Sequence, residues 1–116
     1  MSAALVPEAA WIAVCTVDRL WIDRGAAALV EGEQVAIFRL ADEILAVGHR
    51  DPFTGSNVMA RGLVGSRGDV PTVASPLHKQ VFDLRTGQCL DDPEVTLGRW
   101  DVRVVDDVVW LRRGDA

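Results

Sequence analysis

Two cysteines and two histidines are the side chains of this sequence best suited to holding a metal ion or an iron–sulfur cluster. They are Cys15, His49, His78 and Cys89. Structural zinc sites pair their ligands within about four residues of each other, and neither cysteine has a histidine or a second cysteine that close. The spacing therefore predicts no metal site built from these four residues. Because free cysteine behaves as a small apolar side chain, we expect both thiols to be buried.

Motifs for nucleophilic catalysis and for nucleotide binding are also missing from the sequence. It contains no G-x-S-x-G elbow, no P-loop and no G-x-G-x-x-G after a strand. With only two histidines as candidate bases, residue types alone do not define a catalytic triad. The sequence predicts no catalytic residue and no NAD or ATP site in this chain, so any redox cofactor should belong to a partner.

Length and composition are typical of one folded domain. The chain has 116 residues, of which 49% are hydrophobic and 25% charged, whereas a disordered chain would be far more polar. We predict a single domain over residues 1–116, with a core over about residues 11–112 and frayed ends on either side.

The charge balance argues against a nucleic-acid-binding surface. The formal net charge is -5, from 17 acidic and 12 basic residues, and the sequence has no basic run. Apolar stretches such as residues 26–30 are much shorter than the roughly 20 residues that cross a bilayer, and Glu8 stands where a signal peptide would have a basic segment. We predict a soluble, cytoplasmic protein without nucleic-acid or membrane partners.

Short runs of alternating or β-branched residues, separated by turn residues, predict an all-β protein. The predicted strands cover residues 11–16, 26–30, 34–40, 44–47, 72–75, 81–84, 88–90, 100–104 and 108–112. Residues 48–69 lack alternation and carry five glycines, so we predict a long functional loop there. Alternation predicts core positions for Trp100 and Trp110 and we expect Trp11 in the core too, whereas Trp21 lies between strands and is predicted to be a partly exposed anchor for a partner.

Two segments resemble the cluster-binding loops of Rieske domains. Ser75-Pro76-Leu77-His78, followed by Phe82 and Thr86-Gly87, matches the second loop, C-P-x-H then Phe then T-G, except for the cysteine. The segment Asp51-Pro52-Phe53-Thr54-Gly55 resembles the first loop, C-P-H-x-G. The resemblance implies an antiparallel, Rieske-like β-sandwich with a small inserted subdomain formed by the two former cluster-binding loops.

Three of the four cluster-ligand positions are substituted. In a Rieske cluster two cysteines bind one iron and two histidines the other. Asp51 and Ser75 stand at the cysteine positions and Phe53 at one histidine position, so only His78 is left. A carboxylate and a hydroxyl are poorly matched to iron–sulfur chemistry, and we expect Phe53 to fill space by apolar packing. The resemblance thus implies the fold without the cluster.

This set of substitutions, together with residues 61–65 and 73–76, is similar to the small-subunit family of nitrite reductase over roughly residues 11–111. The resemblance implies a non-catalytic subunit of a cytoplasmic NAD(P)H-dependent enzyme that reduces nitrite to ammonium in nitrate assimilation. FAD, siroheme and an iron–sulfur cluster would then belong to a large subunit that this chain supports or orients. Two alternatives stay open: a Rieske-type ferredoxin of an oxygenase, which requires a bound cluster, and a cluster-free protein-binding adaptor.

Charged residues flank both former ligand loops. His49, Arg50 and Lys79 would lie together at one end of a sandwich and form a docking surface, although solvated loop charges explain them equally well. Asp51 precedes a proline and is expected to cap a turn rather than bind an ion. For His78, a local hydrogen bond is the simpler expectation, and contact with a partner's redox centre is the alternative.

Overall fold

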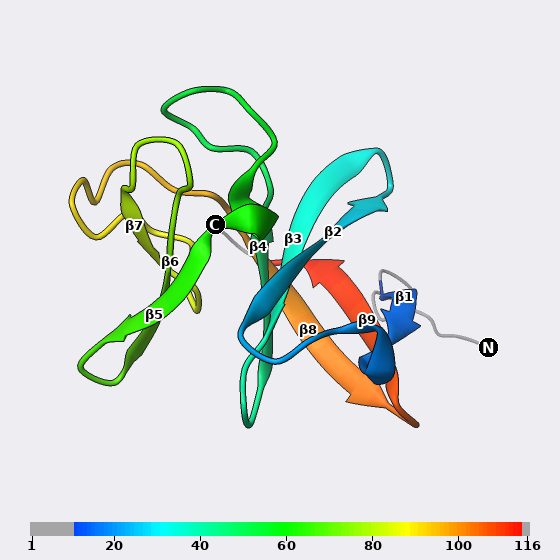
Figure 1. Ribbon diagram of the computed structural model, residues 1–116. Helices are drawn as coiled ribbons and strands as arrows, with labels where there is room; N and C mark the ends of the chain where they lie inside the picture. The colour runs from blue at the N-terminus through cyan, green and yellow to red at the C-terminus, as the bar shows by residue number, and fades with distance from the viewer. Residues whose placement is uncertain (1–10, 115–116) are drawn as a thin grey trace.

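The computed structural model describes residues 11–114, which form two antiparallel β-sheets (Figure 1). The larger sheet has six strands in the order β1-β9-β8-β4-β3-β2, and the smaller has three in the order β5-β6-β7. The strands are β1 (Ile12–Thr16), β2 (Arg24–Val30), β3 (Glu33–Arg39), β4 (Ile44–Gly48), β5 (Leu63–Arg67), β6 (Val70–Ala74), β7 (Val81–Asp83), β8 (Arg99–Val105) and β9 (Val108–Arg113). The prediction of an all-β fold is confirmed.

Two 3-10 turns, η2 (Val17–Arg19) and η3 (Met59–Arg61), are the helical segments of the described residues. Within residues 11–114 no helix is long and apolar enough to cross a membrane.

Tight turns set the register of two hairpins. The turn between β2 and β3 has positive φ at Glu31 (49°) and Gly32 (81°), and the turn between β8 and β9 has positive φ at Asp106 (52°) and Asp107 (65°). Two successive residues with positive φ define a type I′ turn, whose twist matches that of the flanking strands. Both hairpins therefore form at the turns predicted from the sequence.

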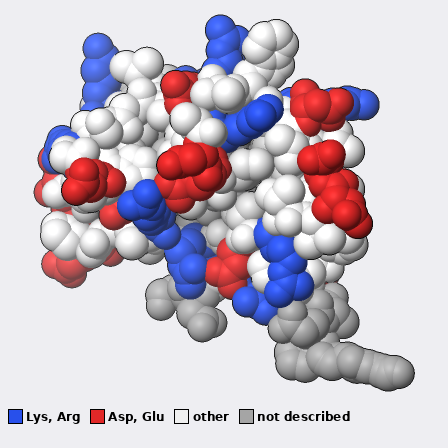
Figure 2. Space-filling view, turned by 90° about the horizontal axis from the view of Figure 1, so that it is seen from below, with Lys and Arg blue, Asp and Glu red and all other residues white. Residues whose placement is uncertain are grey.

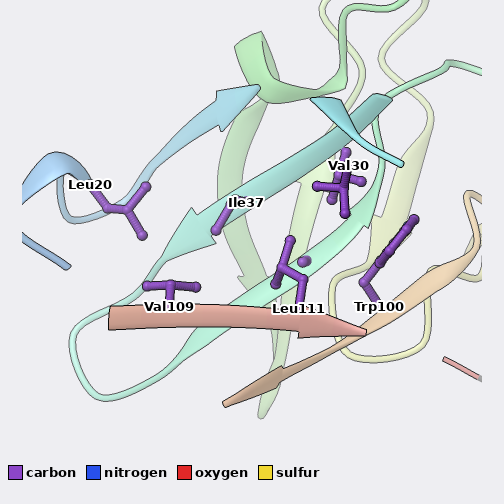
Figure 3. Close-up of a cluster of buried hydrophobic side chains, with 8 residues drawn as sticks. Leu20, Val30, Ile37, Trp100, Val109 and Leu111 are labelled. Atoms are coloured by element: carbon purple, nitrogen blue, oxygen red, sulfur yellow. The ribbon is translucent and has the colours of Figure 1, made fainter. Parts of the chain in front are cut away.

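Strand β3 is buried on both faces and separates two hydrophobic cores. Its residues Val35 and Ile37 pack into a cluster with β8, β9 and Leu20, part of which is drawn in Figure 3. The intervening residues Ala36 and Phe38 face a second cluster, formed with η3 and the small sheet. Because side chains alternate across a strand, one strand supplies both cores.

The strand predictions were wrong in two places: β5 was not predicted, and the strand predicted over residues 88–90 does not form. β5 lies inside the segment predicted as a loop, because its sequence is rich in small and polar residues and its side chains are mostly exposed. Residues 88–90 make only isolated bridges, Phe82 with Cys89 and Gln88 with Thr96. The predicted fraying of the chain ends concerns residues outside the described range, apart from Gly114, which is hydrogen-bonded to Arg99.

The tryptophans divide differently from the prediction. Trp100 is buried in the first core, as predicted, but Trp110 is only half-buried. Trp110 lies opposite Arg103, and its neighbours Val109 and Leu111 point inward, so the register places Trp110 on the outer face of the sheet. Trp11 is half-buried as well, whereas Trp21 is 74% exposed. The core prediction is therefore wrong for Trp110 and Trp11, and the exposure of Trp21 is confirmed.

Candidate functional site

Two loops lie together at one end of the protein and correspond to the former cluster-binding loops. The first follows β4 and covers residues 49–58, and the second joins β6 to β7 over residues 75–80. We call them the paired loops, and both lie toward the top of Figure 1. Because β4 and β6 are each paired with neighbouring strands on both sides, the loops start from fixed positions.

Asp51 and Ser75, which occupy the two former cysteine positions, are hydrogen-bonded to each other. Ser75 Oγ donates to Asp51 Oδ2 at 2.5 Å, and both side chains are buried. Asp51 Oδ1 accepts a second hydrogen bond from the backbone N–H of Phe53 at 2.8 Å. A side-chain bond to the backbone two residues on closes an Asx turn, so the predicted turn-capping role of Asp51 is confirmed.

The paired loops share the same hydrogen-bonding pattern. In each loop the residue at the former cysteine position, Asp51 or Ser75, accepts one bond on its side chain from the N–H two positions on and one on its carbonyl from the N–H four positions on. Its own N–H donates to the carbonyl five positions on. The bonds are Phe53 N to Asp51 Oδ1 (2.8 Å), Gly55 N to Asp51 O (2.7 Å), Asp51 N to Ser56 O (2.8 Å), Leu77 N to Ser75 Oγ (3.3 Å), Lys79 N to Ser75 O (3.0 Å) and Ser75 N to Gln80 O (2.9 Å).

This shared hydrogen-bonding pattern was not predicted from the sequence. The signal was a proline directly after Asp51 and directly after Ser75, namely Pro52 and Pro76. The fourth residue after Asp51 and the fourth after Ser75 both have positive φ, 79° at Gly55 and 62° at Lys79. Only one of these two positions carries the glycine that such a backbone favours, which hid the similarity.

Phe53 and His78, at the former histidine positions, both lie near the surface. Phe53 is 41% exposed, and its ring centroid is 6.3 Å from that of the buried Phe82, with the rings tilted by 51°. The expected apolar packing of Phe53 is therefore partial. His78 is exposed in the second loop, where Lys79 follows it in the sequence.

His49 is buried and does not offer its ring to a partner. It is 6% exposed, and its Nδ1 accepts a hydrogen bond from the backbone N–H of Ala60 at 3.1 Å. Burial, and then the positive charge of Arg61, lower the pKa of His49. The docking prediction for His49 needs correction, because this imidazole fastens the first loop to η3 instead.

The other predicted docking residues divide between two ends of the protein. Arg50 and Lys79 are exposed on the paired loops, and the guanidinium of Arg50 lies against Gly55. The loop that carries Trp21 lies at the opposite end of β3, because Asp23 N bonds to Arg39 O, whereas His49 N bonds to Gln34 O. Five residues of extended strand separate these two points by about 17 Å. The structure thus brings Arg50 and Lys79 to one end and keeps Trp21 away from them.

Comparison with known proteins places this fold in a family. The profile of the Rieske-like 2Fe-2S domain matches residues 10–112, so the chain belongs to the Rieske-like domain family. The NADH nitrite reductase small subunit of Salmonella typhimurium is 41% identical over 104 residues, covering 88% of this chain and 96% of that protein. The solution structure of the NAD(P)H nitrite reductase small subunit from Erwinia carotovora superposes with a TM-score of 0.77 at 36% identity, covering 91% of this chain and 83% of that chain. Within the Rieske-like domains, this chain is a member of the nitrite reductase small-subunit family.

A third relative is much longer than this chain. The NAD(P)H nitrite reductase large subunit of Klebsiella oxytoca is 36% identical over 106 residues, which cover 91% of this chain but 11% of that protein. A domain of this kind is therefore part of a long polypeptide in that relative.

The residues present do not fit a 2Fe-2S cluster. The cluster requires two thiolates for one iron and two imidazoles for the other. Here the two thiolate positions hold a carboxylate and a hydroxyl that are bonded to each other, and one imidazole position holds the phenyl ring of Phe53. Within residues 11–114, no three His, Cys, Asp or Glu side chains gather as metal ligands.

Proposed function

We propose that this chain is the non-catalytic small subunit of an NAD(P)H-dependent nitrite reductase and that it supports or orients the large subunit. The observation that carries the proposal is the buried hydrogen bond between Asp51 and Ser75, which joins the paired loops where the family's cluster would join them. The chain keeps the shape of the electron-transfer domain and has replaced its ligands. Nitrite reduction to ammonium, with FAD, siroheme and an iron–sulfur cluster, would take place on the large subunit in the cytoplasm, during nitrate assimilation.

The long Klebsiella oxytoca relative supports the choice of partner. A domain similar to this chain forms 11% of a polypeptide named as the large subunit. Domains joined in one polypeptide in one organism and separate in another commonly work side by side, so the partner of this chain would be its own large subunit.

Docking would use the exposed basic side chains of the paired loops. Arg50 and Lys79 lie at one end of the protein on a scaffold that the Asp51–Ser75 bond holds in place. Trp21 is a separate candidate anchor, since a large exposed aromatic ring contributes much contact area at a small cost in entropy. We also propose that residues 1–116 fold as one domain, because β3 contributes to both cores.

A pull-down combined with a deletion tests the proposal. A tagged copy would be recovered from cells grown on nitrate, and the eluate assayed for NAD(P)H-dependent nitrite reduction. We expect a large siroheme-containing subunit to copurify with that activity, and we expect deletion of the chain to lower nitrite reduction in cells. Normal nitrite reduction in the deletion strain would favour a protein-binding adaptor. Iron and the visible absorbance of a cluster in the purified chain would favour an oxygenase ferredoxin.

A further inference from the structure

Five large apolar side chains are exposed on the loop before β2, at the start of β5 and on the paired loops. Trp21 and Ile22 precede β2, and Leu63, the first residue of β5, is 77% exposed. Phe53 and Leu77 are the exposed apolar residues of the paired loops. Single exposed apolar side chains are common on any protein, whereas a group of them commonly marks a binding site.

A groove lies between the start of β2 and the start of β5. Its volume is about 550 Å³, and its lining includes Asp23, Arg24, Arg61 and Leu63. Trp21 lies beside this groove, because a 3.2 Å hydrogen bond from Arg24 N to Trp21 O closes a tight turn. We call this hollow the β2–β5 groove.

Close backbone packing fixes the shape of the groove. A Cβ at Gly25 would lie 2.4 Å from Ala60 O, and a Cβ at Gly62 would lie 2.6 Å from Ala74 O. Because glycine has no Cβ, η3 packs directly against β2, and the chain enters β5 directly against the end of β6 (Figure 1). The walls of the groove are therefore fixed before a partner arrives, so binding loses little free energy to rearrangement.

Two arginines supply positive charge in the groove. Arg24 and Arg61 are exposed, and neither forms an ion pair with any residue that the structure describes. Asp23 brings one carboxylate to the lining. Figure 2 shows acidic and basic side chains interspersed on the face seen from below, so neither sign of charge dominates that face. Because salt screens exposed charges more than about 8 Å apart, a partner in the groove would meet mainly the charges that line it.

The β2–β5 groove connects the loop of Trp21 with the paired loops. η3 is tied to the first of these loops by the hydrogen bond from Ala60 N to His49 Nδ1, and Leu63 lies opposite Ala74, at the base of the second. A protein–protein interface of ordinary size buries about 800 Å² on each partner, a patch roughly 30 Å across. One partner surface that covers both Trp21 and the paired loops would therefore cover the groove as well.

We propose that the β2–β5 groove receives an apolar side chain of the nitrite reductase large subunit, and that Arg24 and Arg61 bind carboxylates of that subunit beside it. This inference rests on the proposed function, and it joins Trp21 and the paired loops into one docking surface. Removing the exposed apolar surface of Leu63 and Trp21 from water favours binding. The two guanidinium groups then select a partner with acidic groups at matching positions.

Binding of the purified chain to its large subunit tests the apolar contact. Leu63→Asp removes an exposed apolar side chain and adds a negative charge where we expect carboxylates of the partner. The dissociation constant should rise at least about tenfold, the effect of losing one important interface residue. Val104→Asp is the matched control and should bind normally, because Val104 is an exposed apolar residue of β8 and the strands β4 and β3 separate β8 from β2.

A second pair of variants tests the expected carboxylates. Arg61→Glu reverses one of the two positive charges of the groove and should also raise the dissociation constant at least about tenfold. Arg61→Lys keeps the charge and should lose less affinity than Arg61→Glu. The melting temperature of each free variant shows whether it is folded.

Hydrogen exchange keeps the test decisive if a variant does not fold. In the unmodified complex we expect slower exchange over residues 22–25 and 60–64 than in the free chain, with no change in β8. Unmodified chain that does not bind the large subunit at all would overturn the proposed function. Normal binding by folded Leu63→Asp or folded Arg61→Glu, an equal loss of affinity in Val104→Asp, or binding of the unmodified chain without that protection would overturn the groove and leave the proposed function intact.

Discussion

Ser75 Oγ donates a hydrogen bond to Asp51 Oδ2 at 2.5 Å across 24 positions of sequence, and both side chains are buried. A carboxylate removed from water needs such donors, because a buried charge without hydrogen bonds is strongly destabilising. Asp51 obtains one from Ser75 and another from the backbone of Phe53. A side-chain hydrogen bond therefore links the paired loops at the two positions where the family's ligand pattern has cysteines.

Removing the hydroxyl at Ser75 should weaken the protein measurably. Ser75→Ala leaves the buried carboxylate of Asp51 one donor short, and hydrogen bonds to charged groups contribute about 1.5–3 kcal/mol. We expect the free energy of unfolding in urea to fall by that amount. Ser66→Ala, at an exposed serine of β5, is the control and should change stability by less than about 0.5 kcal/mol. Equal midpoints for Ser75→Ala and Ser66→Ala would show that the link is not needed.

Lys79 occupies a backbone conformation that suits glycine better than lysine. Its φ is 62°, and the equivalent position of the first loop is Gly55. Relieving the left-handed strain of a residue with a Cβ outweighs the greater flexibility of glycine in the unfolded chain. We expect Lys79→Gly to raise the free energy of unfolding by about 0.5–1 kcal/mol. Lys79→Ala removes the same side chain but keeps the Cβ, and should give no such gain; a gain of equal size in both variants would locate the effect in the lost charge.

His49 should make the stability of the protein depend on pH. Burial, and secondarily Arg61, lower the pKa of His49 below its ordinary value of 6.5, so the unfolded chain takes up a proton at a higher pH than the folded protein. The contribution of this residue to stability is then complete above pH 6.5 and is lost as the pH falls through the folded-state pKa. Protonation at Nδ1 also breaks the bond from Ala60 N.

Chemical unfolding at a series of pH values checks this. We expect the free energy of unfolding to decline below about pH 6.5. His49→Asn provides a short side-chain acceptor for the N–H of Ala60 without a group that titrates in this range, so the decline should become smaller. A decline of the same size in His49→Asn would assign the pH dependence to other groups.

Trp110 and Leu111 are neighbours in β9 that face opposite sides of the sheet. Leu111 is fully buried, and Leu111→Ala should cost about 2–5 kcal/mol, as in other cores. Trp110 is half-buried on the outer face, so Trp110→Ala should cost less than about 3 kcal/mol, below the range for a buried tryptophan. Thermal or urea unfolding of the two variants gives their order. A larger loss for Trp110→Ala would mean that the outer face carries more of the stability than its burial suggests.

The hairpins could be predicted from the sequence because their information is local. Residues 101–112 contain both the alternation and the two aspartates of the turn, and the structure has the hairpin at that place. Alternation shows which residues share a face but not which face is inside. Trp100 and Trp110 both fit a core pattern within their own strands, yet the register pairs Trp100 with Arg113 and Trp110 with Arg103, on opposite sides.

The candidate site depends on relationships that local patterns do not contain. The substituted ligand positions could be found by resemblance, but the bond from Ser75 to Asp51 depends on how two sheets bring distant loops together. His49 is a polar residue at the start of a glycine-rich loop, which predicts exposure. The structure buries it instead, with its Nδ1 hydrogen-bonded to Ala60 of η3.

Strand β3 supplies consecutive side chains to both hydrophobic cores. A cut or a destabilising substitution in this strand would expose the apolar side chains of both cores at once. We therefore expect a protease to yield no resistant fragment that contains only one of the two cores. Because the two cores share this strand, we expect the paired loops and the opposite end of the large sheet to unfold together. A ligand that stabilises either end would then slow the hydrogen exchange of backbone amides throughout the domain.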